Sequence, residues 1–584
     1  MAAGRTLLQT GSGQTGDAEA WRVRRLRTCE YTRALMAWTR RNAPLVLLGA
    51  ALLTSGVMLL VLTRDLTFFQ DTWEFLINRR ELTVDNLLRP HNEHIVLIPV
   101  SIELFFLHVF GMSSALPEYL LMIAMTLVAA VLFFVYAQRR VGPWLALMGT
   151  ALLLFIGPAW SDLLWPFELA FIGSVLFGLA MLLALDRDDT KGDVLACVFL
   201  AISAGFSSLG IAFMAAAIVH LFQHRRERGM RRAWFVAIPV VLFGLWYLGW
   251  GHDAESHLSL RNVLDSPRYV IEGLAISLES LLGLSKAPIE GTTETVLSWG
   301  EPLLIAAVAL VVVQQIRRPG FSSGFWPVLA ATATNWFLTA FNYIPGREPS
   351  TGRYMYAAAV FTLLLAVELL RDIRFSRKTL VIMGAVTVAA VASNIHFFRD
   401  GSNWLKNQSV LTKADLAGIE ISRKHVAPEF ELAPAVAGTP SLIDVFAGPY
   451  LEAEDEFGSP AYTPQELAEA PEPGPRQADV VISQALPLKT STSAGAERPG
   501  QGCLLGGGPG GPEDTTLEPG VTKILTEPGP QVSINLARFA EGEYPVQTAG
   551  AAGDSTTLLT IPRDGSTVPW RLHVEAQQPV YVCH

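Results

Sequence analysis

Residues 44–63 read PLVLLGAALLTSGVMLLVLT, a stretch without a single charged side chain. One α-helix needs about 20 consecutive apolar residues to cross a bilayer. This stretch is therefore predicted to span a membrane. Comparable runs recur as far as Phe397, whereas the chain from Arg399 onward is polar and rich in Gly and Pro. The sequence thus divides into a part suited to lipid and a part suited to water.

The composition excludes an ordinary water-soluble protein. Of the 584 residues, 51% are hydrophobic and 17% are charged, whereas soluble domains carry about 25% charged residues. The net charge of −9 sums over compartments and identifies no partner. The expected regions are a basic cytoplasmic tail (1–43), a transmembrane domain (44–397), a mixed helical linker (398–478) and a β-rich extracytoplasmic domain (479–584).

Clusters of Arg and Lys between the apolar runs predict the orientation, because such clusters favour the cytoplasmic side. The clearest apolar runs are 44–63, 115–137, 143–158, 164–185, 233–250, 300–316, 324–341, 353–370 and 379–397. The basic clusters are Arg22 to Arg41, Arg139-Arg140, His224 to Arg232, Arg317-Arg318 and Arg371 to Lys378. All of these clusters face the cytoplasm only if two further segments take particular conformations.

The first of these segments, 95–110, is expected to lie at the outer membrane interface; a short span is the alternative. The second segment, 193–223, is too long for one crossing and carries Gly and Ser at its centre. It is expected to form two helices, 193–204 and 208–223, which cross in opposite directions. The predicted topology then has about eleven crossings.

The predicted fold class is a polytopic α-helical plasma-membrane protein followed by an α+β domain with a sandwich or jelly-roll-like part. The N-terminus is expected in the cytoplasm, and the C-terminal domain outside it. The outer loops are expected at 64–115 and 251–300. Cys503 and Cys583 both lie in the exported region, where an oxidising compartment favours a disulfide between them.

The first outer loop concentrates ionisable side chains beside the membrane. Asp71 and Glu74 are three residues apart and would share a helix face, and His91, Glu93 and His94 follow. Carboxylates in such a place are costly unless they are paired, bind a cation or do chemistry. One of them could act as a general base, and the group could hold a divalent cation. In the alternative reading these acids only cap helices and pair with Arg79, Arg80 and Arg89.

The order of these features resembles the GT-C superfamily of membrane glycosyltransferases, which use polyprenyl-phosphate sugars. The matching features are the helix 44–63, Asp71, the stretch HNEHIVLIP, Phe110-Gly111 and the span that ends at Arg139-Arg140. The chain also resembles a group of actinobacterial membrane proteins of unassigned function. That second resemblance is carried by LLWPFELAFIGS, FSSLGIAF, GRYMYAAAVF and EFGSPAY.

The resemblance implies a glycosyltransferase with Asp71 as catalytic base and Glu74, Glu93 and His94 as further candidates. Its partners would be a polyprenyl-phosphate sugar, membrane lipids and an envelope glycan acceptor, and not nucleic acid. The loop NYIPGREPSTGRYMYA adds candidates for binding the donor phosphate. These are Arg347, Arg353 and Tyr354, for which an interfacial anchor is the alternative.

Other polar groups have less specific readings. His252, Asp253, Glu255 and His257 have a spacing that suits metal ligands, or they are simply solvated. Trp160, Trp165, Phe167 and Glu168 are expected to form an aromatic belt at a membrane edge or to stack on a sugar.

The region after residue 398 begins with helical spacing and then changes to short β-prone segments. These segments are DVVISQAL, TKILT, QVSINLARF, TTLLTIP, WRLHVEA and VYVCH, separated by Gly/Pro turns. The stretch GQGCLLGGGPGGPED is expected to be a flexible loop. Trp570 is expected in the core and Arg538 on the surface, with contact to sugar as the alternative for both.

Two other functions remain open at this point. One is a transporter or flippase of lipid-linked saccharides. The other is a non-catalytic envelope scaffold whose β domain binds glycan.

Overall fold

The computed structural model describes residues 42–228, 230–285, 298–317, 319–432, 442–495, 497–512, 514–542, 544–547 and 553–583. The cytoplasmic tail expected over 1–43 therefore lies almost wholly outside the described residues, as does Arg318 of one basic cluster.

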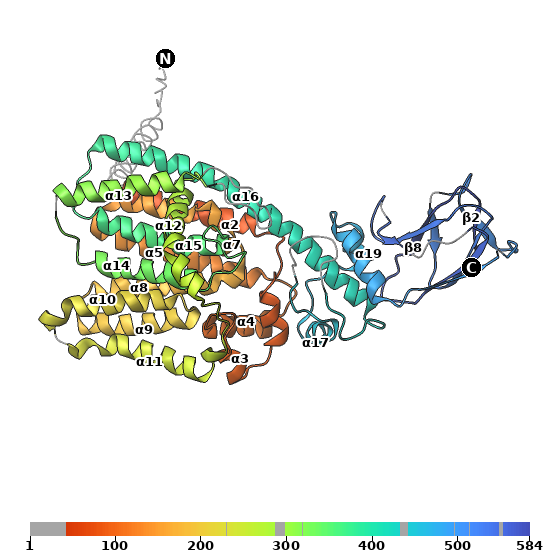
Figure 1. Cartoon of the computed structure of the whole chain (residues 1–584), viewed down its shortest axis with the longest axis horizontal. Helices are drawn as coiled ribbons and strands as arrows, with labels where there is room; N and C mark the ends of the chain where they lie inside the picture. The colour runs from red at the N-terminus through yellow and green to blue at the C-terminus, as the bar shows by residue number, and fades with distance from the viewer. Residues whose placement is uncertain are drawn as a thin grey trace, which may run out of the picture.

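Each apolar run of the predicted transmembrane domain contains a helix, and these helices form a bundle (Figure 1). They are α2 (Ala43–Leu62), α5 (Leu116–Val141), α6 (Pro143–Leu154), α8 (Leu169–Leu185), α9 (Thr190–Phe206), α10 (Gly210–Arg228), α11 (Trp234–Gly249), α13 (Gly300–Arg317), α14 (Phe325–Phe341), α15 (Gly352–Leu369) and α16 (Arg377–Ser422). Among the described residues, 6 helices are long and apolar enough to cross a membrane. The number rises to 7 if α6 and the following Gly157–Leu164, bent by 48°, form one span. The number of about eleven membrane crossings remains a prediction.

The division of 193–223 into two helices is confirmed. Helix α9 ends at Phe206, and α10 begins at Gly210 after an extended Ser207. A Cβ at Gly210 would lie 2.5 Å from the Cα of Ala204, so the tight connection requires a glycine there. Residues 97–110 form α4 (Leu97–Phe110), which belongs to the shorter apolar helices. Its place at the interface stays a prediction.

The described basic clusters gather at one end of the bundle, here called the arginine end. Arg140, at the end of α5, hydrogen-bonds Asp186 at 2.8 Å and also Glu368 near the end of α15. Arg232, after α10, lies 3.2 Å from Asp188. The opposite end, here called the loop end, carries residues 63–115 and faces the C-terminal region (Figure 1). This arrangement agrees with the charge pattern of the sequence.

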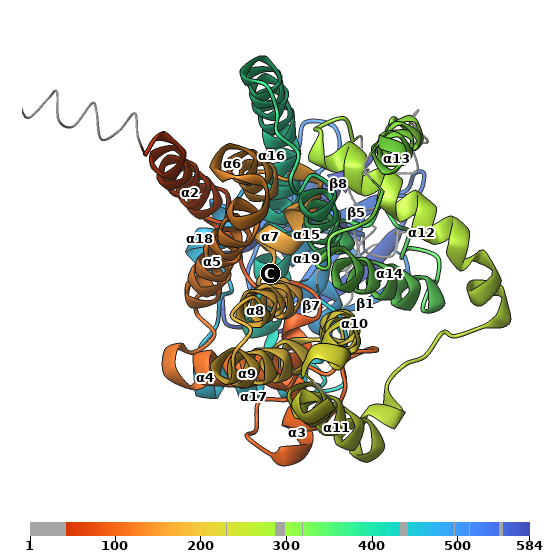
Figure 2. The ribbon, with the colours of Figure 1, turned by 90° about the vertical axis from the view of Figure 1, so that its left-hand side faces the viewer.

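Helix α12 (Leu260–Leu281) runs across the direction of its neighbours in both views (Figures 1 and 2). It crosses the loop end of α13, α14 and α15. The hydroxyl of Tyr269 donates to the carbonyl of Arg347 at 2.8 Å, and the side chain of Asn262 donates to the carbonyls of Phe341 and Tyr343. Helix α12 therefore holds the loop that follows α14.

Helix α16 does not end at residue 397, as the hydropathy predicted; it is 46 residues long and ends at Ser422. The reason is that the polar part keeps helical spacing on one buried face. Ser402 donates to the carbonyl of Leu62 at 2.7 Å, and Ser409 accepts from the backbone N–H of Thr67 at 3.1 Å. The linker expected over 398–478 thus begins as a continuation of the last helix of the bundle. It then forms α17 (Ala447–Phe457) and α18 (Pro464–Ala468).

The prediction of a strand over DVVISQAL, which begins at residue 479, is wrong. The segment belongs to α19 (Gly474–Ala485), whose buried positions Ala478, Val481, Ile482 and Ala485 follow the helical repeat. This face packs against α16, where Gln477 donates to Asp415 at 2.6 Å. Burial against a neighbouring helix overrides the β-propensity of the valines and isoleucine. The β region therefore begins at Lys489.

The β region contains two antiparallel sheets packed around a common core. One has the order β1-β7-β4-β9-β2 and the other β3-β8-β5-β6. The strands are β1 (Lys489–Ala494), β2 (Cys503–Gly507), β3 (Asp514–Leu517), β4 (Gly520–Thr526), β5 (Ser533–Ala537), β6 (Val546–Gln547), β7 (Ser555–Ile561), β8 (Trp570–Glu575) and β9 (Val580–Cys583). Inward-facing side chains such as Ile534, Leu559 and Leu572 form the core between the sheets.

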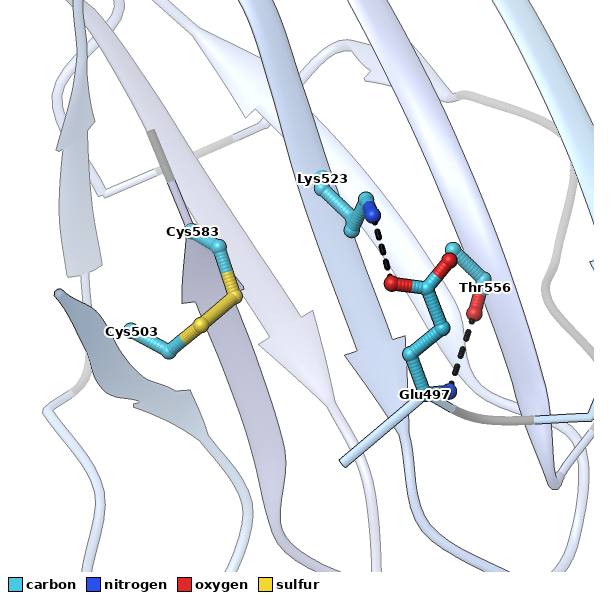
Figure 3. Close-up of a disulfide and its surroundings, with 5 residues drawn as sticks. All are labelled: Glu497, Cys503, Lys523, Thr556 and Cys583. Atoms are coloured by element: carbon cyan, nitrogen blue, oxygen red, sulfur yellow. Dashed lines mark hydrogen bonds and ion pairs between the residues drawn. A yellow bond between two sulfur atoms is a disulfide. The ribbon is translucent and has the colours of Figure 1, made fainter. Parts of the chain in front are cut away.

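A disulfide joins Cys503 of β2 to Cys583 of β9 (Figure 3). The same stretch was predicted to be only a flexible loop, which is wrong, because Cys503–Gly507 pairs with β9 as an edge strand. Arg538 was expected on the surface and is instead buried, bonded to Asp564 at 2.6 Å. Trp570 lies in the core as expected.

Candidate functional site

Glu74 lies in a network that shapes the first loop. Its carboxylate accepts hydrogen bonds from Arg79 and Arg89, both at 3.2 Å. Arg79 in turn donates to the carbonyls of Arg89 and Pro90 at 2.9 and 2.8 Å. Burial alone would raise the pKa of Glu74, but the hydrogen bond from Asn78 and the two arginines together lower it. Glu74 thus stays ionised and holds the loop in place.

The next part of the loop is a tight turn from His91 to His94. The backbone N–H of each histidine donates to the carbonyl of the other, at 3.0 and 2.9 Å, and Asn92 has a φ of 49°. The hydroxyl of Ser208 donates to the carbonyl of Glu93 at 3.1 Å. The backbone N–H of Glu255 donates to the carbonyl of Asn92 at 3.1 Å. The turn is therefore fixed by two segments that are distant in the sequence.

Two side chains extend from this turn toward different partners. The imidazole of His91 lies 3.7 Å from the carboxylate of Asp71. The carboxylate of Glu93 forms a close ion pair with Arg347, which is 254 residues further along the chain. The carboxylate of Asp71 also acts electrostatically on Arg347. The structure thus brings Asp71, Glu93 and Arg347 into one neighbourhood, whereas Glu74 is directed to Arg79 and Arg89.

A cavity of about 280 Å³ opens beside this turn. Its walls come from α10, α11, α14 and α15, together with the loop after α11. The charged and polar lining includes Glu93, His94, Ser208, Glu255, Arg347, Arg353 and Tyr354. The apolar lining includes Phe171, Leu209, Ile211, Ala212, Phe243, Trp246, Leu338 and Ala357. The cavity therefore combines a charged rim from the loops with apolar walls from the helices.

Asp71 is next to this cavity and is not part of its lining. Its side chain is 20% exposed, so it is accessible without being free in solvent. The predicted phosphate-binding residues Arg347, Arg353 and Tyr354 all line the cavity, as do Glu93 and His94. Sequence reasoning thus identified the charged rim.

The side chain of His94 is 32% exposed and lines the cavity. Burial, with smaller contributions from His91 and Arg353, lowers the pKa of His94 to about 4. The imidazole is therefore neutral near pH 7. A neutral ring beside the cavity can donate or accept one hydrogen bond without adding charge.

Other candidates from the sequence are placed differently. His252 pairs with Asp253 and His257 with Glu255 at 3.5 and 3.6 Å, as separate pairs. Within the described ranges, no three His, Cys, Asp or Glu side chains form a group that could hold a metal ion. A divalent cation has no ligand set among those residues.

The aromatic group at Trp160 and Trp165 is buried and packs against Trp404 and Phe69. The predicted aromatic belt or sugar platform is therefore wrong at these positions. Among the aromatic residues that line the cavity, Phe243 and Trp246 on α11 were not identified from the sequence. Their only sequence signal is an aromatic pair inside an apolar run, which is indistinguishable from lipid-facing residues.

No protein family model matches the sequence, and no curated protein sequence matches it. Among solved structures, the chain is similar to the cryo-EM structure of arabinosyltransferase EmbB from Mycobacterium smegmatis, with 13% sequence identity and a TM-score of 0.31. The match covers 91% of this chain and 64% of the EmbB chain, so this chain spans slightly less than two thirds of that protein. The activity must therefore be inferred from the residues of the cavity itself.

Proposed function

We propose that this protein transfers a sugar from a polyprenyl-phosphate-linked donor to a cell-envelope glycan or lipid acceptor on the outer face of the membrane. The observation that carries the proposal is the cavity, where Arg347 and Arg353 meet apolar helical walls. A donor of this class has the same division, with an anionic phosphate between a hydroxylated ring and a hydrocarbon chain. Arginine suits phosphate because its planar guanidinium donates two parallel hydrogen bonds.

The position of α15 supports a phosphate at the rim. Arg353 and Tyr354 lie in the first turn of this 18-residue helix, whose N-terminal end carries a partial positive charge. The apolar chain would leave along α11, whose outward residues Val241, Leu245 and Leu248 are 56%, 60% and 76% exposed. Such exposed apolar side chains are suited to contact with lipid.

In the proposed reaction, an acceptor hydroxyl attacks the anomeric carbon of the donor sugar and its proton passes to the carboxylate of Asp71. The bond between that carbon and the phosphate oxygen breaks, and the electron pair leaves on the polyprenyl phosphate. Arg347 and Arg353 stabilise the charge of this leaving group. Glu93 holds Arg347 until the phosphate takes its place. Neutral His94 offers a hydrogen bond to the acceptor or the ring.

The test uses the full-length protein in lipid vesicles that contain a synthetic polyprenyl-phosphate sugar, with an envelope glycan fragment as acceptor. Asp71→Asn should lower the transfer rate by about 10²–10⁴-fold, the range for loss of a general base. Asp65→Asn is the matched control, because Asp65 is a 70%-exposed acid in the same segment. It should leave the rate unchanged.

Transfer by Asp71→Asn at the rate of the unmodified protein would contradict the role of Asp71. No transfer of any offered sugar by the unmodified protein, with no binding of the donor lipid, would contradict the proposed function as a whole. The scaffold alternative predicts that second outcome together with intact glycan binding by the β domain.

A further inference from the structure

One face of α14 places a row of neutral polar side chains in the wall of the cavity. Asn335, Thr339 and Asn342 line the cavity together. Thr339 follows Asn335 by four residues, and Asn342 follows it by seven. This spacing puts them on the same side of a helix. The hydroxyl of Thr339 donates to the carbonyl of Asn335 at 2.9 Å, and the amide oxygen of Asn342 accepts from the backbone N–H of His257 at 3.3 Å. Two members of the row thus have partners within the protein.

The third member, Asn335, is different. The residue is 8% exposed, and its side-chain amide makes no hydrogen bond with any residue that the structure describes. Because Asn335 lines the cavity, a molecule in the cavity can reach this amide. A primary amide offers both a donor and an acceptor. The unmet hydrogen bonds of Asn335 therefore point to a ligand with hydroxyl groups in the cavity.

The surroundings of Asn335 specify the charge of that ligand. It lies seven residues, about 10 Å along the helix axis, from Asn342 at the rim. The charged lining residues Glu93, Glu255 and Arg347 belong to loops, and Arg353 to the first turn of α15. The cavity-lining residues of α10 and α14 carry no charge and include Ile211, Ala212 and Leu338. A charged substituent placed there would have no partner, at a high cost in free energy.

We propose that the inner part of the cavity is a sugar subsite, in which Asn335 hydrogen-bonds the hydroxyls of a single neutral monosaccharide. This inference rests on the proposed function and adds the class of sugar to it. The cavity of about 280 Å³ is just below the range of about 300–1,000 Å³ typical of small-molecule sites. That volume suits one ring, and the uncharged wall selects against uronic acids and amino sugars.

The experiment measures affinities of the full-length protein in lipid nanodiscs for three probes. They are farnesyl phosphate, farnesyl phosphate linked to a neutral pentose, and farnesyl phosphate linked to a uronic acid. The quantity compared is the ratio of dissociation constants for farnesyl phosphate and the pentose probe, because a fraction of misfolded protein does not change this ratio. Asn335→Leu should lower the ratio by about fivefold, the equivalent of one hydrogen bond.

Two further variants make the result specific. Thr332→Val changes a buried residue of the same helix that does not line the cavity, and it should leave the ratio unchanged. Asn335→Ser keeps a hydroxyl at the position and should restore part of the ratio. It also keeps the test available if the leucine variant does not fold.

The inference is overturned if Asn335→Leu weakens both probes equally, if it changes neither, or if the unmodified protein prefers the uronic acid probe. Tighter binding of farnesyl phosphate by Asn335→Leu, with an unchanged ratio, would also overturn it, because the lipid chain would then occupy this wall. The proposed function fails separately, if the unmodified protein binds none of the three probes or if Arg353→Gln binds them all normally.

Discussion

The two ends of α10 and α14 each border a cavity, and arginines line both. At the arginine end, the cavity of about 390 Å³ is lined by Arg139, Arg140 and Arg371 together with Asp186 and Asp188. Here every lining arginine has a nearby carboxylate. Arg139 lies 3.5 Å from Asp186, Arg140 lies 2.8 Å from it, and Arg371 lies 3.5 Å from Glu368. These pairs join the ends of α5, α8 and α15.

At the loop end, the surroundings of the arginines are different. Glu93 is paired with Arg347, and the lining also includes Glu255 and Arg353 among mainly apolar and neutral polar side chains. A cavity with arginines is therefore not by itself evidence of a ligand. The comparison indicates that the ion pairs of the arginine end stabilise the bundle, whereas the proposed donor site lies at the loop end.

The largest expected effect is on stability at the arginine end. Arg140→Gln would leave the fully buried carboxylate of Glu368 without its closest cation, and loss of one partner of a buried pair costs about 3–5 kcal/mol. Thermal or denaturant unfolding of the detergent-solubilised protein measures this loss. Arg139→Gln is the matched control, because the side chain of Arg139 is 51% exposed; it should cost less than about 1 kcal/mol. Equal losses in the two variants would contradict the distinction.

The second effect is a pH dependence that comes from the loop end. The pKa of His94 is lowered from 6.5 to about 4 in the folded protein. Between pH 6.5 and pH 4, His94 is therefore protonated in the unfolded chain and neutral in the folded protein. Stability should therefore fall as pH decreases through this window, by at most about 1.4 kcal/mol per pH unit. His94→Gln should flatten the curve between pH 6.5 and 4. The control His252→Gln, at a 55%-exposed side chain, should not. Parallel curves for the His94 variant and the unmodified protein would exclude this role.

The smallest effect concerns donor affinity. Arg347→Gln should weaken binding of farnesyl phosphate by about tenfold, because one charge-assisted hydrogen bond is worth about 1.5–3 kcal/mol. Arg347→Lys should recover part of the loss through its charge alone. Arg268→Gln, at an 83%-exposed arginine of α12, is the control and should bind normally. Unchanged affinity in Arg347→Gln would remove Arg347 from the phosphate site.

Local signals in the sequence predicted much of the bundle. Apolar runs of about 20 residues each contain a helix, and Gly210 marks the turn between α9 and α10. The predicted helix boundaries are wrong where a helix continues into a polar stretch that packs against other parts of the protein. Helix α16 continues past residue 397 because Ser402 bonds to the end of α2 and Ser409 to the first loop, and hydropathy contains no information about such bonds.

The candidate site was predictable in its charged rim and unpredictable in its walls. Arg347 and Glu93 are each recognisable as charged residues of a loop. Their pairing across 254 residues depends on the tertiary structure and could not be predicted from the sequence. Asn335 is the one side-chain amide in the apolar run 324–341, and the same pattern occurs at Asn394. Asn394 donates to the carbonyl of Ser280 at 3.0 Å and does not line the cavity. Only the three-dimensional arrangement separates the two asparagines.

The unbroken course of α16 has a mechanical consequence for the chain. At 46 residues it is about 69 Å long, and it connects the lipid-embedded part directly to the helix that supports the β-sandwich (Figure 1). A continuous helix of this length bends little at its middle. A tilt of about 5° would carry its far end through about 6 Å. A change in bilayer thickness that tilts α16 would therefore displace the sandwich relative to the membrane surface.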